Sequence, residues 1–96
     1  MVHVISRKAL RLFWERYPDS TRPLVRWFQT MERTTFTNFA NLRRTFPSAD
    51  MIGRLIVFNI AGNKYRLIAS IHFNRGKVYI RHVLTHKEYD QGGWKQ

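Results

Sequence analysis

Two stretches in the first half of the chain repeat apolar residues every three or four positions, which is the spacing of an amphipathic helix. The apolar positions of the first stretch are Leu10, Phe13, Trp14 and Tyr17, and those of the second are Leu24, Trp27, Phe28 and Met31. Ser6 is placed to cap the first helix, and Pro18 ends it. The second helix is predicted to begin near Ser20 or Thr21, with Pro23 in its first turn. Both apolar stripes are expected to form core, because aromatic residues at this spacing usually pack against another element.

The second half of the chain has the pattern of a small sheet. Three stretches rich in Ile, Val, Phe and Tyr run from about 53 to 60, 64 to 73 and 77 to 85. Their connections contain Gly62-Asn63 and Asn74-Arg75-Gly76, which tolerate positive φ, so consecutive antiparallel hairpins are predicted. Val2, Val4 and Ile5 predict a short opening strand, and residues 35 to 46 allow a short third helix that Pro47 ends. The fold class is α+β, with N-terminal helices on one face of a mainly antiparallel sheet.

Strand alternation divides the side chains of this sheet between two faces. The sets predicted to face the helices are Ile56, Phe58 and Ile60 in the first stretch and Tyr65, Leu67, Ala69, Ile71 and Phe73 in the second. Asn59 and Arg66 then lie on the face that the helices leave open. In the third stretch, alternation places Tyr79, Arg81 and Val83 on one face and Val78, Ile80, His82 and Leu84 on the other. The open face is either a solvated side of the sheet or a platform for a ligand.

The length and net charge of the chain limit its number of domains and the class of partner that it can bind. The 96 residues are expected to form one domain, 1–96, because so short a chain encloses only one modest core. The 17 Lys and Arg outnumber the 6 Asp and Glu, giving a formal charge of +11. Such a surface favours a polyanionic partner, nucleic acid or an acidic protein, over a generic basic protein. The chain has no cysteine, no signal-peptide pattern at its start and no membrane-span pattern, so a cytoplasmic location and no membrane association are expected.

The end of the third β stretch is dense in groups that handle protons and negative charge. His86, Lys87 and Tyr89 follow it, and an antiparallel neighbour could bring Arg66 beside them. Cleavage of RNA by its own 2′-hydroxyl needs proton transfer and stabilisation of charge on phosphorus, and such residues supply both without a metal or cofactor. Basic and aromatic residues at a sheet edge also describe binding modules that do not cleave. A metal site at His82 and His86 is disfavoured, since four positions along a strand span roughly 13 Å.

Four segments together resemble the HigB family of toxins from bacterial type II toxin–antitoxin systems, within the RelE-like superfamily. They are HVISRKALRLFW, FPSAD, VFNIAGNKYRLIA and YIRHVLTHKEYD, and the similarity runs from about residue 3 to residue 90. The resemblance implies a RelE-like fold and an endoribonuclease, an mRNA interferase, that cleaves messages in the translating ribosome. It also implies a HigA-type antitoxin whose complex with the toxin binds operator DNA. The even distribution of positive charge along the chain separately suggests that ribosomal RNA helps to dock the protein.

The same resemblance, joined to the residue chemistry, gives a hypothesis for the site. Catalysis is assigned to Arg66 for charge on the scissile phosphate, His86 for proton transfer, Lys87 for charge stabilisation and Tyr89 for stacking or proton relay. The residues expected to bind RNA are Asn59, Lys64, Tyr79 and Arg81. Some relatives carry a lysine at the position of Asn59. The competing interpretations are a non-catalytic module that blocks translation by occupying the ribosome, and a structural ribosome-associated protein.

Overall fold

Five strands form one sheet in the computed structural model, which describes residues 3–95. In the order β1-β5-β4-β3-β2, the strands are β1 (His3–Ile5), β5 (Lys77–Thr85), β4 (Tyr65–His72), β3 (Leu55–Ile60) and β2 (Asp50–Ile52). All neighbouring pairs are antiparallel except β1 with β5, which is parallel. The three long strands lie where the β pattern predicted them. Val2, predicted for the first strand, lies outside the described residues.

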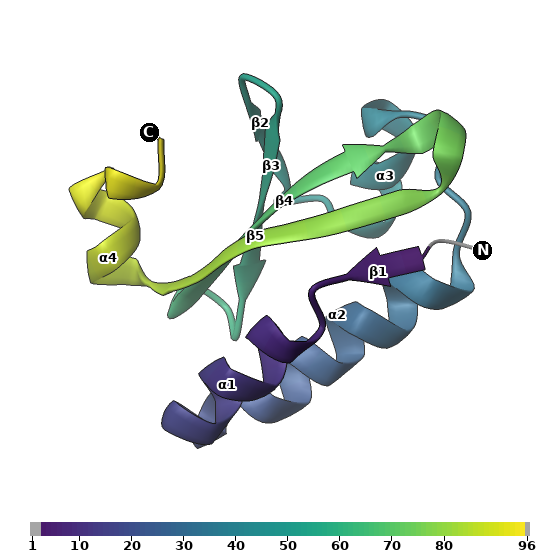
Figure 1. The fold of residues 1–96 in the computed structure, drawn as a ribbon. Coiled ribbons are helices and arrows are strands. Elements are labelled where there is room, and N and C mark those ends of the chain that lie inside the picture. Colours follow the sequence, from purple (N-terminus) through teal and green to yellow (C-terminus); the bar gives the residue numbers. More distant parts are fainter. Residues whose placement is uncertain (1–2, 96) are drawn as a thin grey trace.

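Helices cover the two faces of the sheet unequally (Figure 1). The helices α1 (Lys8–Arg16) and α2 (Thr21–Arg33) pack on one face, α3 (Phe39–Thr45) lies at the far end, and α4 (His86–Gln91) lies on the other side, at the end of β5. The main core joins the predicted stripes of α1 and α2 to the predicted inner sets of β3 and β4. The α+β arrangement is therefore confirmed. None of the helices in residues 3–95 has the length and apolar character needed to cross a bilayer.

The predicted alternation of the third stretch is wrong beyond Ile80, because β5 contains a bulge. Ala69 of β4 pairs with Ile80, but the preceding Ile68 pairs with His82, so Arg81 is the extra residue. Val78 and Ile80 face the core, whereas Val83 also packs toward the core and Leu84 packs on the opposite face. The bulge thus moves His82 and Leu84 to the open face, which Tyr79 also occupies.

The predicted cap of the first helix is wrong, whereas the predicted hairpin connections are confirmed. Ser6 makes no side-chain cap; it adopts a φ of 75°, and its carbonyl accepts a hydrogen bond from Ala9 N at 3.0 Å, while Arg7 occupies the N-cap position of α1. In the β3–β4 turn, positive φ falls on Gly62 and also on Ala61. Asn63 has a different role, because it binds the side chain of Arg66.

Candidate active site

Arg66 lies on the open face of the sheet, opposite Asn59 of β3 and Leu84 of β5. Its side chain is nevertheless buried, with 7% of the residue exposed. The guanidinium donates through Nη1 to the carbonyls of Asn63 and Tyr65, both at 3.1 Å, and through Nη2 to Asn63 Oδ1 at 2.5 Å. Two residues of the chain thus fix the direction of the Arg66 fork.

The burial of Arg66 comes from the C-terminal segment, which folds back over the sheet. The Tyr89 ring lies 5.3 Å from the guanidinium carbon, and the Trp94 ring stacks on Tyr89 at 5.1 Å and 10°. Trp94 Nε1 also donates to the Tyr89 carbonyl at 2.9 Å. Trp94 is buried against Val57 and Ile68, so it anchors this segment to the sheet. Tyr89 is therefore held over Arg66 by an apolar contact.

No carboxylate in residues 3–95 forms an ion pair with Arg66. Carbonyl dipoles and an aromatic face solvate its charge only in part, and a buried cation is costly unless it is paired. An anion bound beside Arg66 would complete this pairing. Arg66 therefore has the surroundings of an oxyanion or phosphate site.

His86 is positioned by the junction between β5 and α4. Thr85 and Glu88 form a capping box: Glu88 N donates to Thr85 Oγ1 at 3.2 Å, and Thr85 N donates to Glu88 Oε1 at 2.9 Å. The backbone N–H of His86 also donates to the carbonyl of Lys64 at 3.0 Å, which ties α4 to the β3–β4 turn. His86 consequently begins α4 beside the strand that carries Arg66.

The His86 imidazole has an acidic partner on its own helix. Its Nδ1 lies 3.2 Å from Asp90 Oδ2, one helical turn away, and both side chains are about half exposed. A proton on Nδ1 shared with Asp90 leaves Nε2 free to exchange a proton with a ligand. This pair resembles the base and orienting carboxylate of a general acid–base site.

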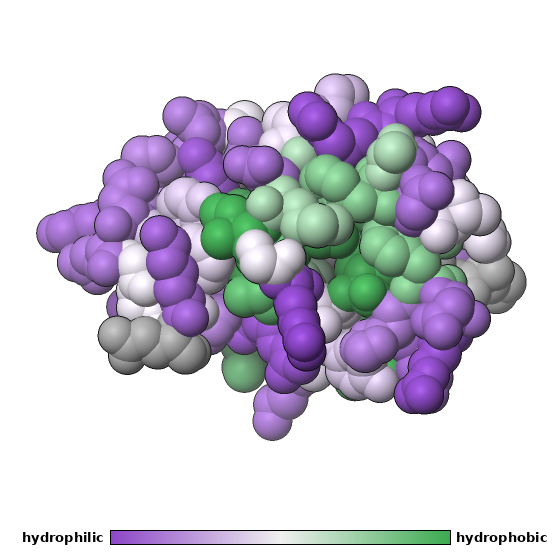
Figure 2. Space-filling view, turned by 90° about the horizontal axis from the view of Figure 1, so that it is seen from above, coloured by the Kyte–Doolittle hydropathy of each residue, from purple (hydrophilic) through white to green (hydrophobic). Residues whose placement is uncertain are grey.

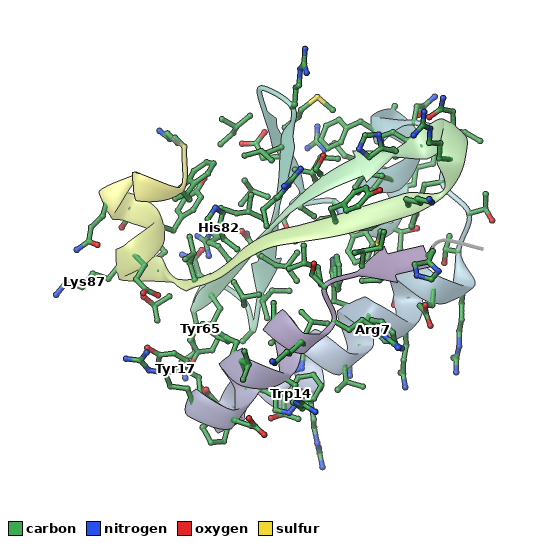
Figure 3. All side chains as sticks on the ribbon, viewed as in Figure 1. Arg7, Trp14, Tyr17, Tyr65, His82 and Lys87 are labelled. Carbon is green, nitrogen blue, oxygen red and sulfur yellow. The ribbon has the colours of Figure 1, made fainter. Side chains whose placement is uncertain are left out.

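Lys87 and Lys64 are not brought to Arg66. Lys87 points outward from α4, away from the sheet (Figure 3). Lys64 Nζ pairs instead with Asp19 Oδ2 at 2.5 Å, and the Tyr65 hydroxyl donates to Asp19 Oδ1 at 2.6 Å. The hydrogen bonds from Lys64 and Tyr65 lower the pKa of Asp19, and the bond to Asp19 raises the pKa of Tyr65 to about 12.

The remaining predicted residues follow the open face away from α4. Asn59 is exposed opposite Arg66, while Tyr79 lies near the distant end, where its ring makes a T-shaped contact with His72 at 5.3 Å. The exposed Arg81 lies at the bulge, with its guanidinium carbon 6.0 Å from the Tyr79 ring. Arg66 and Tyr89 are thus in contact, with His86 one helical turn before Tyr89 on α4; we call these three residues the first cluster, and Tyr79 and Arg81 the second.

Between these clusters the open face is apolar. Figure 2 shows this face, with an apolar patch bordered by hydrophilic side chains. The partly buried residues around Val57, Ile68 and Trp94 are Ile52, Leu55, Leu84 and Tyr89. A surface of this kind can accommodate the flat faces of nucleobases while surrounding cations hold phosphates. Within residues 3–95, no group of three or more His, Cys, Asp or Glu side chains could hold a metal ion.

Sequence reasoning missed three residues of the site: Asn63, Asp90 and Trp94. A signal existed for Asp90, because Thr85-x-x-Glu88 is a capping-box pattern and a helix beginning there places His86 and Asp90 one turn apart. Asn63 was interpreted only as a turn residue. Trp94 gave no local signal, since its contacts are with strands far away in the sequence.

Known proteins similar to this chain identify its family. A family model described as HigB toxin, the RelE-like toxic component of a toxin–antitoxin system, matches residues 20–92. The mRNA interferase toxin HigB of Escherichia coli K12 is 39% identical over 92 residues, covering 93% of this chain and 88% of that protein. The mRNA interferase HigB of Escherichia coli O6:H1 is 27% identical over 93 residues, covering 94% and 90%. The resemblance found in the sequence is confirmed: the chain belongs to the HigB family of RelE-like toxins of toxin–antitoxin systems.

Proposed function

We propose that this toxin is an mRNA endoribonuclease that cleaves translated messages through their own 2′-hydroxyl groups. The observation that carries the proposal is at the β5–α4 junction, where α4 brings Tyr89 against a buried arginine without an acidic partner and begins with a histidine that has an orienting carboxylate. This cluster provides a place for a phosphate and a group that transfers protons. The names of the E. coli relatives, mRNA interferases, support the same reaction.

The reaction assigns one role to each member of the cluster. The 2′-oxygen attacks phosphorus and the bond to the 5′-oxygen breaks, leaving a 2′,3′-cyclic phosphate and a 5′-hydroxyl. Arg66 stabilises the charge that develops on the phosphoryl oxygens through Nε–H and the second Nη2–H, the donors that its bonds to Asn63 and Tyr65 do not use. His86, with Nδ1 directed to Asp90, exchanges protons at Nε2 with the attacking or leaving oxygen. The Tyr89 ring, in contact with both Arg66 and Trp94, holds the guanidinium in place, and its hydroxyl is a candidate for proton relay.

RNA then follows the open face from this cluster toward Tyr79. Asn59 is exposed beside Arg66 and can contact a base edge or phosphate, while Tyr79 offers a ring for a more distant base and Arg81 a charge for its phosphate. Lys64 is held by Asp19 but is still 65% exposed, so it adds positive potential near the scissile phosphate. Lys87, on the outer side of α4, is placed to contact ribosomal RNA or a flanking phosphate.

The partners follow from the charge and the family. A formal charge of +11 distributed over the chain suits docking on ribosomal RNA, with an affinity that falls steeply as salt rises. We propose that cleavage depends on this docking and that the protein acts in the cytoplasm. A HigA-type antitoxin neutralises the toxin, and their complex binds operator DNA. Metal and organic cofactors have no role in the proposed chemistry.

The test is to map message ends by primer extension in a cell-free translation reaction. Native toxin should create new ends that carry a 5′-hydroxyl, and the same RNA without ribosomes should stay intact. The Arg66→Ala variant should lose about 100-fold or more of the cleavage rate, the usual contribution of one such group.

Two other outcomes would change the proposal. Ends that appear in both settings would identify a nuclease of free RNA, so ribosome dependence would be wrong. Blocked translation with intact message would identify a binding module and overturn the nuclease itself. A binding affinity that stays constant across salt concentrations would contradict docking through ribosomal RNA.

A further inference from the structure

A second surface with a distinct character lies on the other side of the molecule, between α1 and α2. It is a groove of about 590 Å³. Trp14 of α1 and Val25 and Phe28 of α2 give it an apolar floor, and all three are only partly buried. Figure 3 places Trp14 and Arg7 on this helical side of the sheet, away from His82 and α4. RNA bound along the open face would therefore not reach the groove.

Three cations form the rim of the groove. Arg7, Lys8 and Arg11 come from the first turns of α1, and no carboxylate is among the described residues that line it. The Arg7 guanidinium carbon lies 5.6 Å from the centre of the Phe28 ring, so this side chain lies against the floor. The rim consequently has a fixed positive charge directly beside apolar surface.

This combination selects among polyanionic partners. Phosphates of RNA would bind the rim, but the RNA of the proposed reaction lies along the open face, on the other side of the molecule. A groove between two helices instead accepts an amphipathic helix, whose apolar face lies on the floor. Carboxylates one turn away on that helix would meet Arg7, Lys8 and Arg11. The surface therefore fits an acidic, amphipathic protein segment better than nucleic acid.

We infer that the α1–α2 groove is the docking site for an acidic amphipathic helix of the cognate antitoxin. The inference rests on the proposed antitoxin partner, but it does not depend on the proposed nuclease chemistry. Because none of the groove residues belongs to the cluster of Arg66, His86 and Tyr89, binding of antitoxin and cleavage of RNA can be separated by mutation.

The absence of cysteine from the chain allows a direct test. Arg11→Cys places a unique thiol on the rim, and Arg44→Cys places one on α3, outside the groove lining. Each variant is treated with a maleimide, with and without purified cognate antitoxin, and labelling of the toxin chain is followed by mass spectrometry. Antitoxin should slow labelling at position 11 by about 10-fold or more, as expected for a thiol covered at an interface, and leave position 44 within about two-fold.

Charge reversal tests the partner's chemistry. Arg7→Glu with Arg11→Glu changes the rim, and Arg33→Glu with Arg44→Glu makes the same change in net charge elsewhere on the helices. The groove variant should bind antitoxin about 100-fold more weakly, whereas the control should stay within about three-fold. Thermal unfolding of both variants establishes that they are folded.

The results that would contradict antitoxin docking in the α1–α2 groove differ from those that would contradict RNA cleavage by the toxin. Equal protection at positions 11 and 44, or equal loss of antitoxin affinity in both double variants, would show that antitoxin docks elsewhere. Protection of position 11 by ribosomes but not by antitoxin would make the groove an RNA-docking surface. The groove variant is also assayed for message cleavage alongside native toxin, and only failure of the native toxin to cleave counts against the nuclease.

Discussion

Two neighbouring residues of β4, Tyr65 and Arg66, direct polar groups to opposite faces of the sheet, and their surroundings differ in one respect. On the helical side, the hydroxyl of Tyr65 and the ammonium of Lys64 share the carboxylate of Asp19. On the open side, Arg66 has carbonyls, an amide and the Tyr89 ring, but no acid of residues 3–95 is ion-paired with it. The first group is neutralised within the chain, and the second is not.

This difference indicates which group supports the fold and which is available for a ligand. A compensated cluster gains less from an added anion, since the carboxylate of Asp19 already offsets the charge of Lys64 and accepts the hydrogen bond of Tyr65. An uncompensated buried arginine gains most from one, because a phosphate supplies the pairing that the protein withholds. The comparison predicts that mutations on the two sides will separate stability from cleavage.

The largest effect is expected at Arg66. Replacing it with Ala removes the charge beside the scissile phosphate and should lower message cleavage by about 100-fold or more. Lys64→Ala, its matched control two positions away, should change cleavage by less than about five-fold, because an exposed lysine contributes mainly screened potential. Primer extension with ribosomes measures both rates. If the two variants lose cleavage equally, the distinction between a paired and an unpaired cation is wrong.

The pair of His86 and Asp90 should show a coupled effect. His86→Ala removes the proton-transfer group and should cost about 100-fold, and Asp90→Ala should cost about 10-fold by releasing the imidazole. In the His86→Ala background, Asp90→Ala should add almost nothing, since the carboxylate acts only through the ring. Single-turnover cleavage rates of the native protein, the two single variants and the double variant give this double-mutant cycle. Fully additive losses would separate Asp90 from His86 and assign it another role.

Tyr89 should give a smaller effect that distinguishes its two candidate roles. Its ring contacts Arg66 and Trp94, so Tyr89→Phe preserves these contacts and should keep cleavage within about three-fold, whereas Tyr89→Ala should lose about 10-fold. The measurement is the cleavage rate with ribosomes saturating. A large loss in Tyr89→Phe would instead show that the hydroxyl relays a proton.

Local pattern predicted much of the fold and less of the site. Alternation placed Phe58, Leu67 and Arg66 on their correct faces because β3 and β4 are regular there. Alternation gave the wrong faces for the residues after Arg81, because a bulge there changes the backbone without altering the apolar pattern of the strand. The burial of Arg66 could not be predicted either, because it depends on Trp94 folding back across the sheet, a contact between residues distant in sequence.

The smallest effect is expected from the compensated side, in the pH dependence of stability. The pKa of Tyr65 is about 12 in the folded protein against 10.0 as its ordinary value, because the hydroxyl donates to Asp19. The unfolded chain therefore loses this proton first, and the stabilisation that is present below pH 10 is lost as pH rises toward 12. Asp19 has a lowered pKa, so its contribution to stability is present above pH 3.8 and is lost as the solution becomes more acidic.

Urea unfolding of native protein and Tyr65→Phe between neutral pH and pH 12 should show the alkaline decline in stability only in the native protein, with message cleavage at neutral pH unchanged. A decline of equal steepness in both would mean that other groups determine it, and reduced cleavage in Tyr65→Phe would mean that the two faces of β4 are not independent.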